Sequence, residues 1–299
     1  MTRSGFIALA GRPNVGKSTL VNQIVGAKVA IVSDKPQTTR RAIRGVATHA
    51  VEPDPWQLIL TDLPGVQRPR DRLTERMQAR VETELAESDG VLFVVNAEQG
   101  VRADTGGDRW IADVLRGVST PIVIAVNKVD RIDHPRTAAA LQGAADLGLD
   151  AEIYPVSART GAGVGPLVQH LLSLLPEGPF YFPAGERSDV TEDLHLAELV
   201  REQVLHRTRQ EVPHAVEVQV DEIEEHHDVV AIRATIWAET ESQKGILIGA
   251  HGRMIKEIGT AARKEIERER AQRVHLDLSV RVRRSWRADE RMLDRLGIG

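Results

Sequence analysis

A short glycine-rich segment, Gly11–Ser18, limits what this 299-residue chain can fold into. It fits the pattern G-x-x-x-x-G-K-S/T, in which backbone N–H groups wrap the phosphates of a nucleotide. Apolar residues 6–10 before it predict a buried strand, and residues 18–25 after it predict a helix. The backbone N–H groups of the turn and the positive end of that helix would then face the same anion. The alternative is a glycine turn that precedes Lys-Ser by chance, and the strand before it and the helix after it argue against that. We therefore predict a nucleotide-phosphate site.

Within this loop the residue types suggest separate tasks. Lys17 should reach the β- and γ-phosphates, and Ser18 should offer its hydroxyl to Mg²⁺. The residues expected to contact the nucleotide here are Gly11, Arg12, Pro13, Asn14, Val15, Gly16, Lys17, Ser18 and Thr19.

Strand-like and helical segments alternate from residue 6 to about residue 175. Further strands are expected at 46–51, 57–60, 91–95, 122–126 and 152–156, and helices at 73–88, 108–116, 137–147 and 165–175. This alternation indicates an α/β domain with a doubly wound, mostly parallel sheet that is covered on both faces. Ligands of such sheets bind beyond the carboxyl ends of the strands, where the glycine-rich loop would lie.

Residues 176–190 predict a linker after this first domain (residues 1–175). Positions 176 to 185 hold three prolines and two glycines, which disfavour a helix or a central strand. Residues 191–299 then predict a small α+β domain in the order helix, strand, strand, helix, helix, strand. These elements are expected at 193–209, 216–220, 230–237, 243–248, 254–269 and 275–282.

Charge is unevenly distributed along the chain. The net charge is −4, yet residues 251–287 hold eleven Lys or Arg against five Asp or Glu. A basic segment on an acidic body suggests a nucleic acid partner, and a solvated charged helix is the equal alternative on charge alone. The absence of cysteine excludes disulfides and thiol chemistry, and the apolar runs are too short to span a bilayer. We expect a cytoplasmic protein, with a peripheral contact to the inner membrane left open.

The segment Asn-Lys-Val-Asp at residues 127–130 follows an apolar strand, where its side chains could distinguish one nucleotide base from another. Asp130 can accept hydrogen bonds from N1–H and the 2-amino group of guanine, and losing such a pairing costs a factor of about 10⁴. Asn127 would brace neighbouring loops, and Lys128 would lay its alkyl stem over the base. Ser157 and Ala158 follow the next strand, where the Ala158 N–H is suitably placed for guanine O6. An isolated Asn-Lys-x-Asp would be only a charged turn, so its position carries the inference.

Asp62-Leu63-Pro64-Gly65 follows the strand at 57–60. Asp62 would hold Mg²⁺ through water, and the Gly65 N–H would sense the γ-phosphate. Residues 36–40 lie where a second γ-phosphate-sensing loop is expected, and Thr39 is favoured over Thr38 to complete the Mg²⁺ shell. The predicted metal ligands are Ser18, Thr39 and Asp62. Beyond the first loop, the predicted nucleotide contacts are Asp62, Leu63, Pro64, Gly65, Asn127, Lys128, Asp130, Ser157 and Ala158.

These motifs together resemble the translation-factor-related GTPases, and within them the Era family. The resemblance covers almost the whole chain, and the second domain with its Gly249–Gly252 loop and closing Arg284-Ser285-Trp286 narrows it to Era. It implies a P-loop GTPase domain, a type II KH domain, and binding to the 3′ end of 16S ribosomal RNA in 30S subunit maturation. Leu63 replaces the threonine of the usual Asp-Thr-Pro-Gly. Because Asp62 and Gly65 remain, hydrolysis is expected to survive, with an altered rate as an open outcome.

Hydrolysis must proceed without a water-orienting glutamine, because Val66 occupies the position where Ras-like GTPases carry one. The resemblance therefore implies slow intrinsic turnover. In related GTPases an asparagine at the position of Asn14 helps to hold a K⁺ ion that supplies positive charge to the transition state. A purely loop-shaping Asn14 is the equal alternative. The residues expected to act in hydrolysis are Lys17, Thr39, Gly65 and Asn14.

The Gly-x-x-Gly loop of a KH domain lets an RNA backbone approach helix amides, while an adjacent groove reads about four unpaired bases. Alone, a Gly-x-x-Gly is often only a helix cap. Here it joins two helices in the right strand order, although a mostly neutral His251 replaces the basic residue common in this loop. The predicted RNA contacts are Lys244, Gly249, Ala250, His251, Gly252, Arg253 and Lys256, with Arg263 and Lys264 nearby.

The leading interpretation is a monomeric GTP-hydrolysing switch that couples nucleotide state to single-stranded ribosomal RNA, with the linker at 176–190 as the candidate relay. Two alternatives stay open. One is a nucleotide-regulated membrane or cell-cycle scaffold with incidental RNA affinity. Salt-dependent, sequence-selective binding to single-stranded ribosomal RNA would distinguish the leading interpretation from it. The other is an RNA chaperone with an inactive GTPase half, which Lys17→Ala would leave functional.

Overall fold

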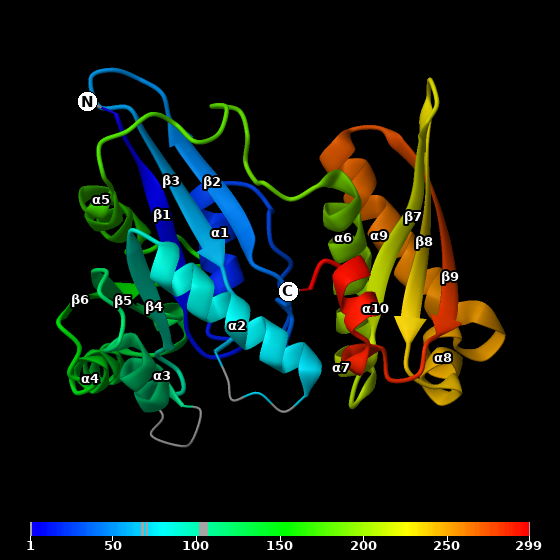
Figure 1. Cartoon of the computed structure of the whole chain (residues 1–299), viewed down its shortest axis with the longest axis horizontal. Coiled ribbons are helices and arrows are strands. Elements are labelled where there is room, and N and C mark those ends of the chain that lie inside the picture. The colour runs from blue at the N-terminus through cyan, green and yellow to red at the C-terminus, as the bar shows by residue number, and fades with distance from the viewer. Residues whose placement is uncertain (1, 67–68, 70, 102–106, 299) are drawn as a thin grey trace.

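A six-stranded sheet forms the centre of the first domain in this computed structural model, which describes residues 2–66, 69, 71–101 and 107–298. The strand order is β2-β3-β1-β4-β5-β6, with β2 antiparallel to β3 and the other neighbours parallel (Figure 1). The strands are β1 (Arg3–Ala10), β2 (Ile43–His49), β3 (Trp56–Asp62), β4 (Gly90–Asn96), β5 (Ile122–Asn127) and β6 (Ala151–Val156).

Helices cover both faces of this sheet, as the alternation predicts. Helices α1 (Lys17–Val25) and α5 (Val164–Leu174) pack on one face, and α2 (Arg72–Glu87), α3 (Asp108–Leu115) and α4 (His134–Ala145) pack on the other. The predicted fold class is confirmed. The strand expected at 46–51 instead begins at Ile43 and ends at His49, because the chain must turn after His49 for Trp56 to pair antiparallel with it.

The linker segment lies along the first domain. The ring of Tyr181 meets that of Phe6 edge to face at 4.8 Å between centroids. The Gln57 side chain accepts hydrogen bonds from the N–H groups of Tyr181 and Phe182 and donates to the Phe182 carbonyl at 2.8 Å. The Gln57 amide thus provides hydrogen-bond partners for backbone groups of the linker, which has no sheet neighbour to pair with at these residues.

The second domain has a three-stranded sheet in the order β7-β8-β9, with β7 and β8 antiparallel and β8 and β9 parallel. Helices α6 and α9 lie side by side against one face and share two apolar clusters with the sheet (Figure 1). The elements are α6 (Glu192–Arg207), α7 (Val212–Ala215), β7 (Glu217–Glu225), β8 (Val229–Ala238), α8 (Glu241–Ile248), α9 (Arg253–Arg270) and β9 (Arg273–Val282). In the described part of the chain no helix is long and apolar enough to cross a membrane.

The C-terminal segment contains a helix that the sequence patterns did not predict, and it packs on the first domain. It contains the short helix α10 (Glu290–Arg295), which Asp289 caps by accepting a hydrogen bond from the Met292 N–H. Its apolar side chains pack on Leu73 and Met77 of α2, so the end of the chain returns to the first domain (Figure 1). The docked residues are Trp286, Met292, Leu293, Leu296 and Ile298.

This docking predicts a measurable contribution to stability. Leu293 is fully buried, so Leu293→Ala should lower the free energy of unfolding by about 2–5 kcal/mol through lost burial and a residual cavity. Arg291→Ala, at an exposed position of the same helix, should change it by less than about 0.5 kcal/mol. Urea unfolding monitored by circular dichroism measures both. Equal effects of the two substitutions would show that the segment is not held against α2.

Candidate nucleotide site and nucleic-acid interface

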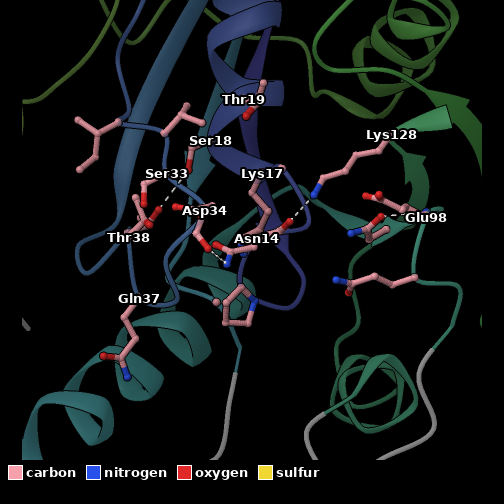
Figure 2. Close-up of a pocket in the computed structure, with 18 of the residues that line it drawn as sticks. Asn14, Lys17, Ser18, Thr19, Ser33, Asp34, Gln37, Thr38, Glu98 and Lys128 are labelled. Carbon is pink, nitrogen blue, oxygen red and sulfur yellow. Dashed lines mark hydrogen bonds between the residues drawn. The ribbon is translucent and has the colours of Figure 1, made fainter. Parts of the chain in front are cut away.

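The glycine-rich loop connects β1 to α1 and borders a cavity of about 420 Å³. A Cβ at Gly11 would lie 2.5 Å from the Val94 carbonyl oxygen, and one at Gly16 would lie 2.3 Å from the Asn127 amide nitrogen. Both glycines also have positive φ, at 148° and 101°. The loop therefore needs glycine at both positions to approach its neighbours closely. Figure 2 shows Asn14, Lys17 and Ser18 around this cavity, with Lys128 on its other side.

Lys17 and Asp62 are two buried charges within this site. The Lys17 ammonium donates to the carbonyl oxygens of Gly11 and Arg12 at 3.0 and 3.1 Å. Burial lowers the pKa of Lys17 to about 8, against the opposing charge of Asp62. Burial also raises the pKa of Asp62, against the charge of Lys17 and hydrogen bonds from Ser18 and Thr39. Both charged forms are poorly compensated here, so an anion near Lys17 and a cation near Asp62 would stabilise them.

The three predicted metal ligands lie together. Ser18 Oγ donates to Asp62 Oδ2 at 2.6 Å, Thr39 Oγ1 donates to the same oxygen at 3.1 Å, and the two hydroxyls are 3.1 Å apart. Thr38 is turned elsewhere, because its hydroxyl donates to the Lys35 carbonyl at 2.6 Å. Asp62 Oδ1 is buried without a hydrogen-bond partner among the described residues. Hard oxygen donors beside an uncompensated carboxylate fit Mg²⁺.

The residues predicted to recognise the base brace one another. The Asn127 amide donates to the Val15 carbonyl at 2.9 Å, and its oxygen accepts from the Ala158 N–H at 2.9 Å. Lys128, at φ 70°, donates through Nζ to the Asn14 carbonyl at 2.7 Å. Bracing by Asn127 follows the sequence expectation. The Ala158 N–H, expected to serve guanine O6, is already engaged by Asn127 in this conformation.

Asp130 is held as an ionised acceptor. Ser157 Oγ donates to its Oδ1 at 2.7 Å, and Arg159 Nε donates to its Oδ2 at 3.0 Å. The hydrogen bond from Ser157 lowers the pKa of Asp130, burial opposes it, and the hydrogen bond and charge of Arg159 lower it further. Arg159 was not predicted as a site residue, although it directly follows Ser157-Ala158 in the sequence. A base bound at Asp130 must share the carboxylate with Arg159 or displace it.

The unusual residues of the 62–66 segment have structural explanations. The side chain of Leu63 is fully buried in the apolar cluster under α2 and α3, so it replaces the usual threonine without facing the cavity. Val66 is also buried in that cluster, and its N–H donates to the Gly11 carbonyl at 3.1 Å. A Cβ on Gly65 would lie 2.6 Å from Pro13 Cγ. Gly65 therefore keeps this segment close to the phosphate loop.

The Arg12 side chain turns away from the predicted phosphate site. Its Nε donates to Asp108 Oδ1 at 2.9 Å, and its Nη1 donates to Gln99 Oε1 at 3.1 Å. Asp108 is fully buried at the start of α3. Only the backbone of Arg12 can face phosphates in this arrangement. Sequence reasoning missed Asp108 because the pair spans 96 positions and belongs to no spaced motif.

The Gly-x-x-Gly loop lies in the second domain, between α8 and α9. A Cβ on Gly249 would lie 2.7 Å from Met254 Cβ, and both glycines have φ above 70°. Beside the loop, a groove of about 480 Å³ runs between α9 and β9. It is lined by Ile255, Lys256, Gly259, Thr260, Arg263, His275, Leu276 and Leu278. Cations beside an apolar floor suit stacked bases and a phosphate backbone.

Two family models match separate parts of this chain. The family model described as a 50S ribosome-binding GTPase matches residues 6–128, and the KH domain model matches residues 211–287. The GTPase Era of Carboxydothermus hydrogenoformans is 45% identical over 287 residues, covering 95% of this chain and 94% of that protein. The GTPase Era of Mycobacterium sp. (strain KMS) is 43% identical over 301 residues, covering 99% and 98%.

Two solved structures are similar over the full length. One is a crystal structure of Era with MgGDPNP and nucleotides 1506–1542 of 16S ribosomal RNA, at TM-score 0.93, 34% identity and complete coverage of both chains. The other is Aquifex aeolicus Era, as a variant bound to GDP·AlF4⁻, at TM-score 0.91, 33% identity and 99% coverage of both chains. Motifs, geometry and similarity thus agree along the whole chain. The protein belongs to the Era family of GTPases.

Proposed function

We propose that this protein hydrolyses GTP as a switch, binds the single-stranded 3′ end of 16S ribosomal RNA, and assists assembly of the 30S subunit. The observation that carries the proposal is the convergence of Ser18, Thr39 and Asp62 on one point beside the buried Lys17. It is supported by similarity to an Era structure that contains MgGDPNP and 16S RNA. A cytoplasmic monomer is part of the proposal, and a peripheral membrane contact stays a prediction of the sequence.

The site residues would divide the chemistry of hydrolysis between them. Lys17 would neutralise β- and γ-phosphate oxygens, and Gly65 would donate its N–H to the γ-phosphate. Ser18, Thr39 and Asp62 would hold Mg²⁺, which spreads the developing charge when it is bound. Val66 is buried and cannot orient water, so catalysis would rest on positioning and electrostatics and be slow without further stimulation.

Guanine selectivity is proposed to depend on Asp130. Asp130→Asn replaces an acceptor oxygen with an NH₂ donor, so affinity for GDP should fall by about 10⁴-fold. Xanthosine diphosphate should bind the variant better than GDP does, because xanthine offers an oxygen where guanine has its amino group. Titration of both nucleotides against both proteins measures this. Unchanged GDP affinity in the variant would remove Asp130 from the base site.

We also propose that Asn14 contributes to a K⁺ site. Its amide nitrogen donates to the Asp34 carbonyl at 2.6 Å, which leaves the amide oxygen as the ligand atom near the phosphate loop (Figure 2). Turnover should then be at least about 10-fold faster in KCl than in NaCl of equal ionic strength. Asn14→Ser should abolish the difference between the salts. Equal turnover of the wild type in both salts would leave Asn14 with a loop-shaping role only.

RNA binding is proposed for the Gly-x-x-Gly loop and the groove beside it. Arg253 and Lys256 are exposed at the start of α9. Replacing both with Gln should weaken binding to a single-stranded oligonucleotide of the 16S 3′ end and reduce the slope of log affinity against log salt by about 2. Arg233→Gln is the control, since Arg233 is exposed between the buried Ile232 and Ala234 of β8. Identical salt slopes in both variants would argue against this interface.

A further inference from the structure

The peptide that carries Thr39 is held on both sides by the second domain. Arg201 of α6 donates through Nη2 to the carbonyl of Thr38, the residue before Thr39. Arg40, the residue after Thr39, buries its whole guanidinium in the second domain. There its Nη1 donates to the Val216 carbonyl at 2.6 Å and to Glu217 Oε2 at 2.8 Å.

Other contacts make Arg40 an anchor with little freedom. Its Nη2 donates to the carbonyls of Pro213 and His214 at 3.2 and 3.1 Å, so α7 surrounds the guanidinium with backbone acceptors. The Arg40 guanidinium carbon also lies 5.6 Å from the ring centroid of Trp286. A planar guanidinium held by four acceptors and one aromatic face can adopt essentially one position.

Glu217 is the centre of a buried cluster of charges at this interface. Guanidinium nitrogens of Arg40, Arg41 and Arg201 lie 2.8, 3.3 and 3.6 Å from its carboxylate oxygens. Burial alone would raise the pKa of Glu217, but the charges of Arg41, Arg40 and Arg201 outweigh it and lower that pKa to about 2. Glu198 completes the cluster, at 2.9 Å from Arg41 and 2.6 Å from Arg201.

Two more contacts connect α6 to the start of the same loop. Glu202 accepts from the Val32 N–H at 2.9 Å and from Lys28 Nζ at 2.5 Å. At its other end the loop reaches the C-terminal segment, because Arg41 Nε donates to the Leu296 carbonyl at 2.8 Å. The second domain and the C-terminal segment therefore contact this loop at Lys28, Val32, Thr38, Arg40 and Arg41. The linker contacts the first domain on different residues, so these bonds give a direct route between the domains.

We propose that Arg201, together with Glu217 acting through Arg40, is a positioning element for the Mg²⁺ site. This rests on the proposed role of Thr39 as a metal ligand. Mg²⁺ accepts little deviation from octahedral geometry at about 2.0–2.1 Å, so a small shift of peptide 38–40 would take the Thr39 hydroxyl out of reach. Docking of the second domain thus completes the site for the γ-phosphate form. GDP, which lacks the γ-phosphate sensed by this loop, does not require it.

The test compares nucleotide affinities of full-length variants. Arg201→Met should weaken binding of a non-hydrolysable GTP analogue at millimolar Mg²⁺ by about 10- to 100-fold, because a charge-assisted hydrogen bond to the Thr38 carbonyl is lost. GDP affinity should stay within about 2-fold. Arg201→Lys should be intermediate, since it keeps the charge but not the planar fork. Fluorescent nucleotide titrations with and without Mg²⁺ measure all of these affinities.

Arg207→Met is the matched control on the same helix. Arg207 donates within α6, to the carbonyl and the side-chain oxygen of Gln203, and should leave both affinities unchanged. If Arg201→Met is unfolded at the assay temperature by circular dichroism, Arg201→Lys and Glu217→Gln carry the same comparison. Equal losses for GDP and the GTP analogue, or no loss for either, would overturn the proposal.

The same data separate this inference from the proposed function. If the wild type itself shows no Mg²⁺-dependent binding of the GTP analogue, the proposed nucleotide site fails. If the wild type shows that dependence and the variants of Arg201 and Glu217 keep it in full, only the positioning role fails.

Discussion

The Asp62 carboxylate joins three parts of the chain that are separate in the sequence. It ends β3 and accepts hydrogen bonds from Ser18 at the start of α1 and Thr39 in the loop before β2. Burial disfavours the ionised carboxylate and so raises the pKa of Asp62. A bound cation would stabilise that ionised form. The buried Lys17 has the complementary need for an anion. The site is thus suited to bind a nucleotide and a metal together.

The second domain holds the peptide that carries Thr39. An apolar contact would tolerate sliding, but a cluster of buried guanidinium and carboxylate groups is stable only with close geometry, because desolvation of each charge must be matched by its partners. Arg40 and Glu217 therefore fix the geometry in which the two domains meet. The C-terminal segment contributes the apolar part of the same interface through Leu293 and its neighbours against α2.

Much of the nucleotide site could be predicted from the sequence, because each motif directly follows a strand. In a parallel sheet the carboxyl ends of strands meet at one edge, so position in the pattern is enough to bring Lys17, Asp62 and Asn127 together. The second domain could be predicted for a similar reason, since period-two and helical patterns mark its elements. The sequence favoured Thr39 over Thr38, and in the structure the Thr39 hydroxyl turns toward Asp62 while the Thr38 hydroxyl donates to the Lys35 carbonyl.

The domain interface could not be predicted in this way. Arg40 and Glu217 are 177 positions apart, and neither belongs to a spaced motif. Arg201 lies on α6 among other charged residues, and only the fold distinguishes it from a solvated arginine. The short helices α7 and α10 lack enough turns for a periodic pattern. Contacts of this kind depend on how two domains dock, which no local pattern of residues encodes.

If docking of the second domain positions Thr39, nucleotide state and RNA binding should be coupled through this interface. The most direct measurement is the affinity of the full-length protein for a 16S 3′-end oligonucleotide with a GTP analogue, with GDP and without nucleotide, at one salt concentration. We expect tighter RNA binding with the GTP analogue than with GDP, and a matching gain in analogue affinity when RNA is present. Equal RNA affinity in all three states would contradict it.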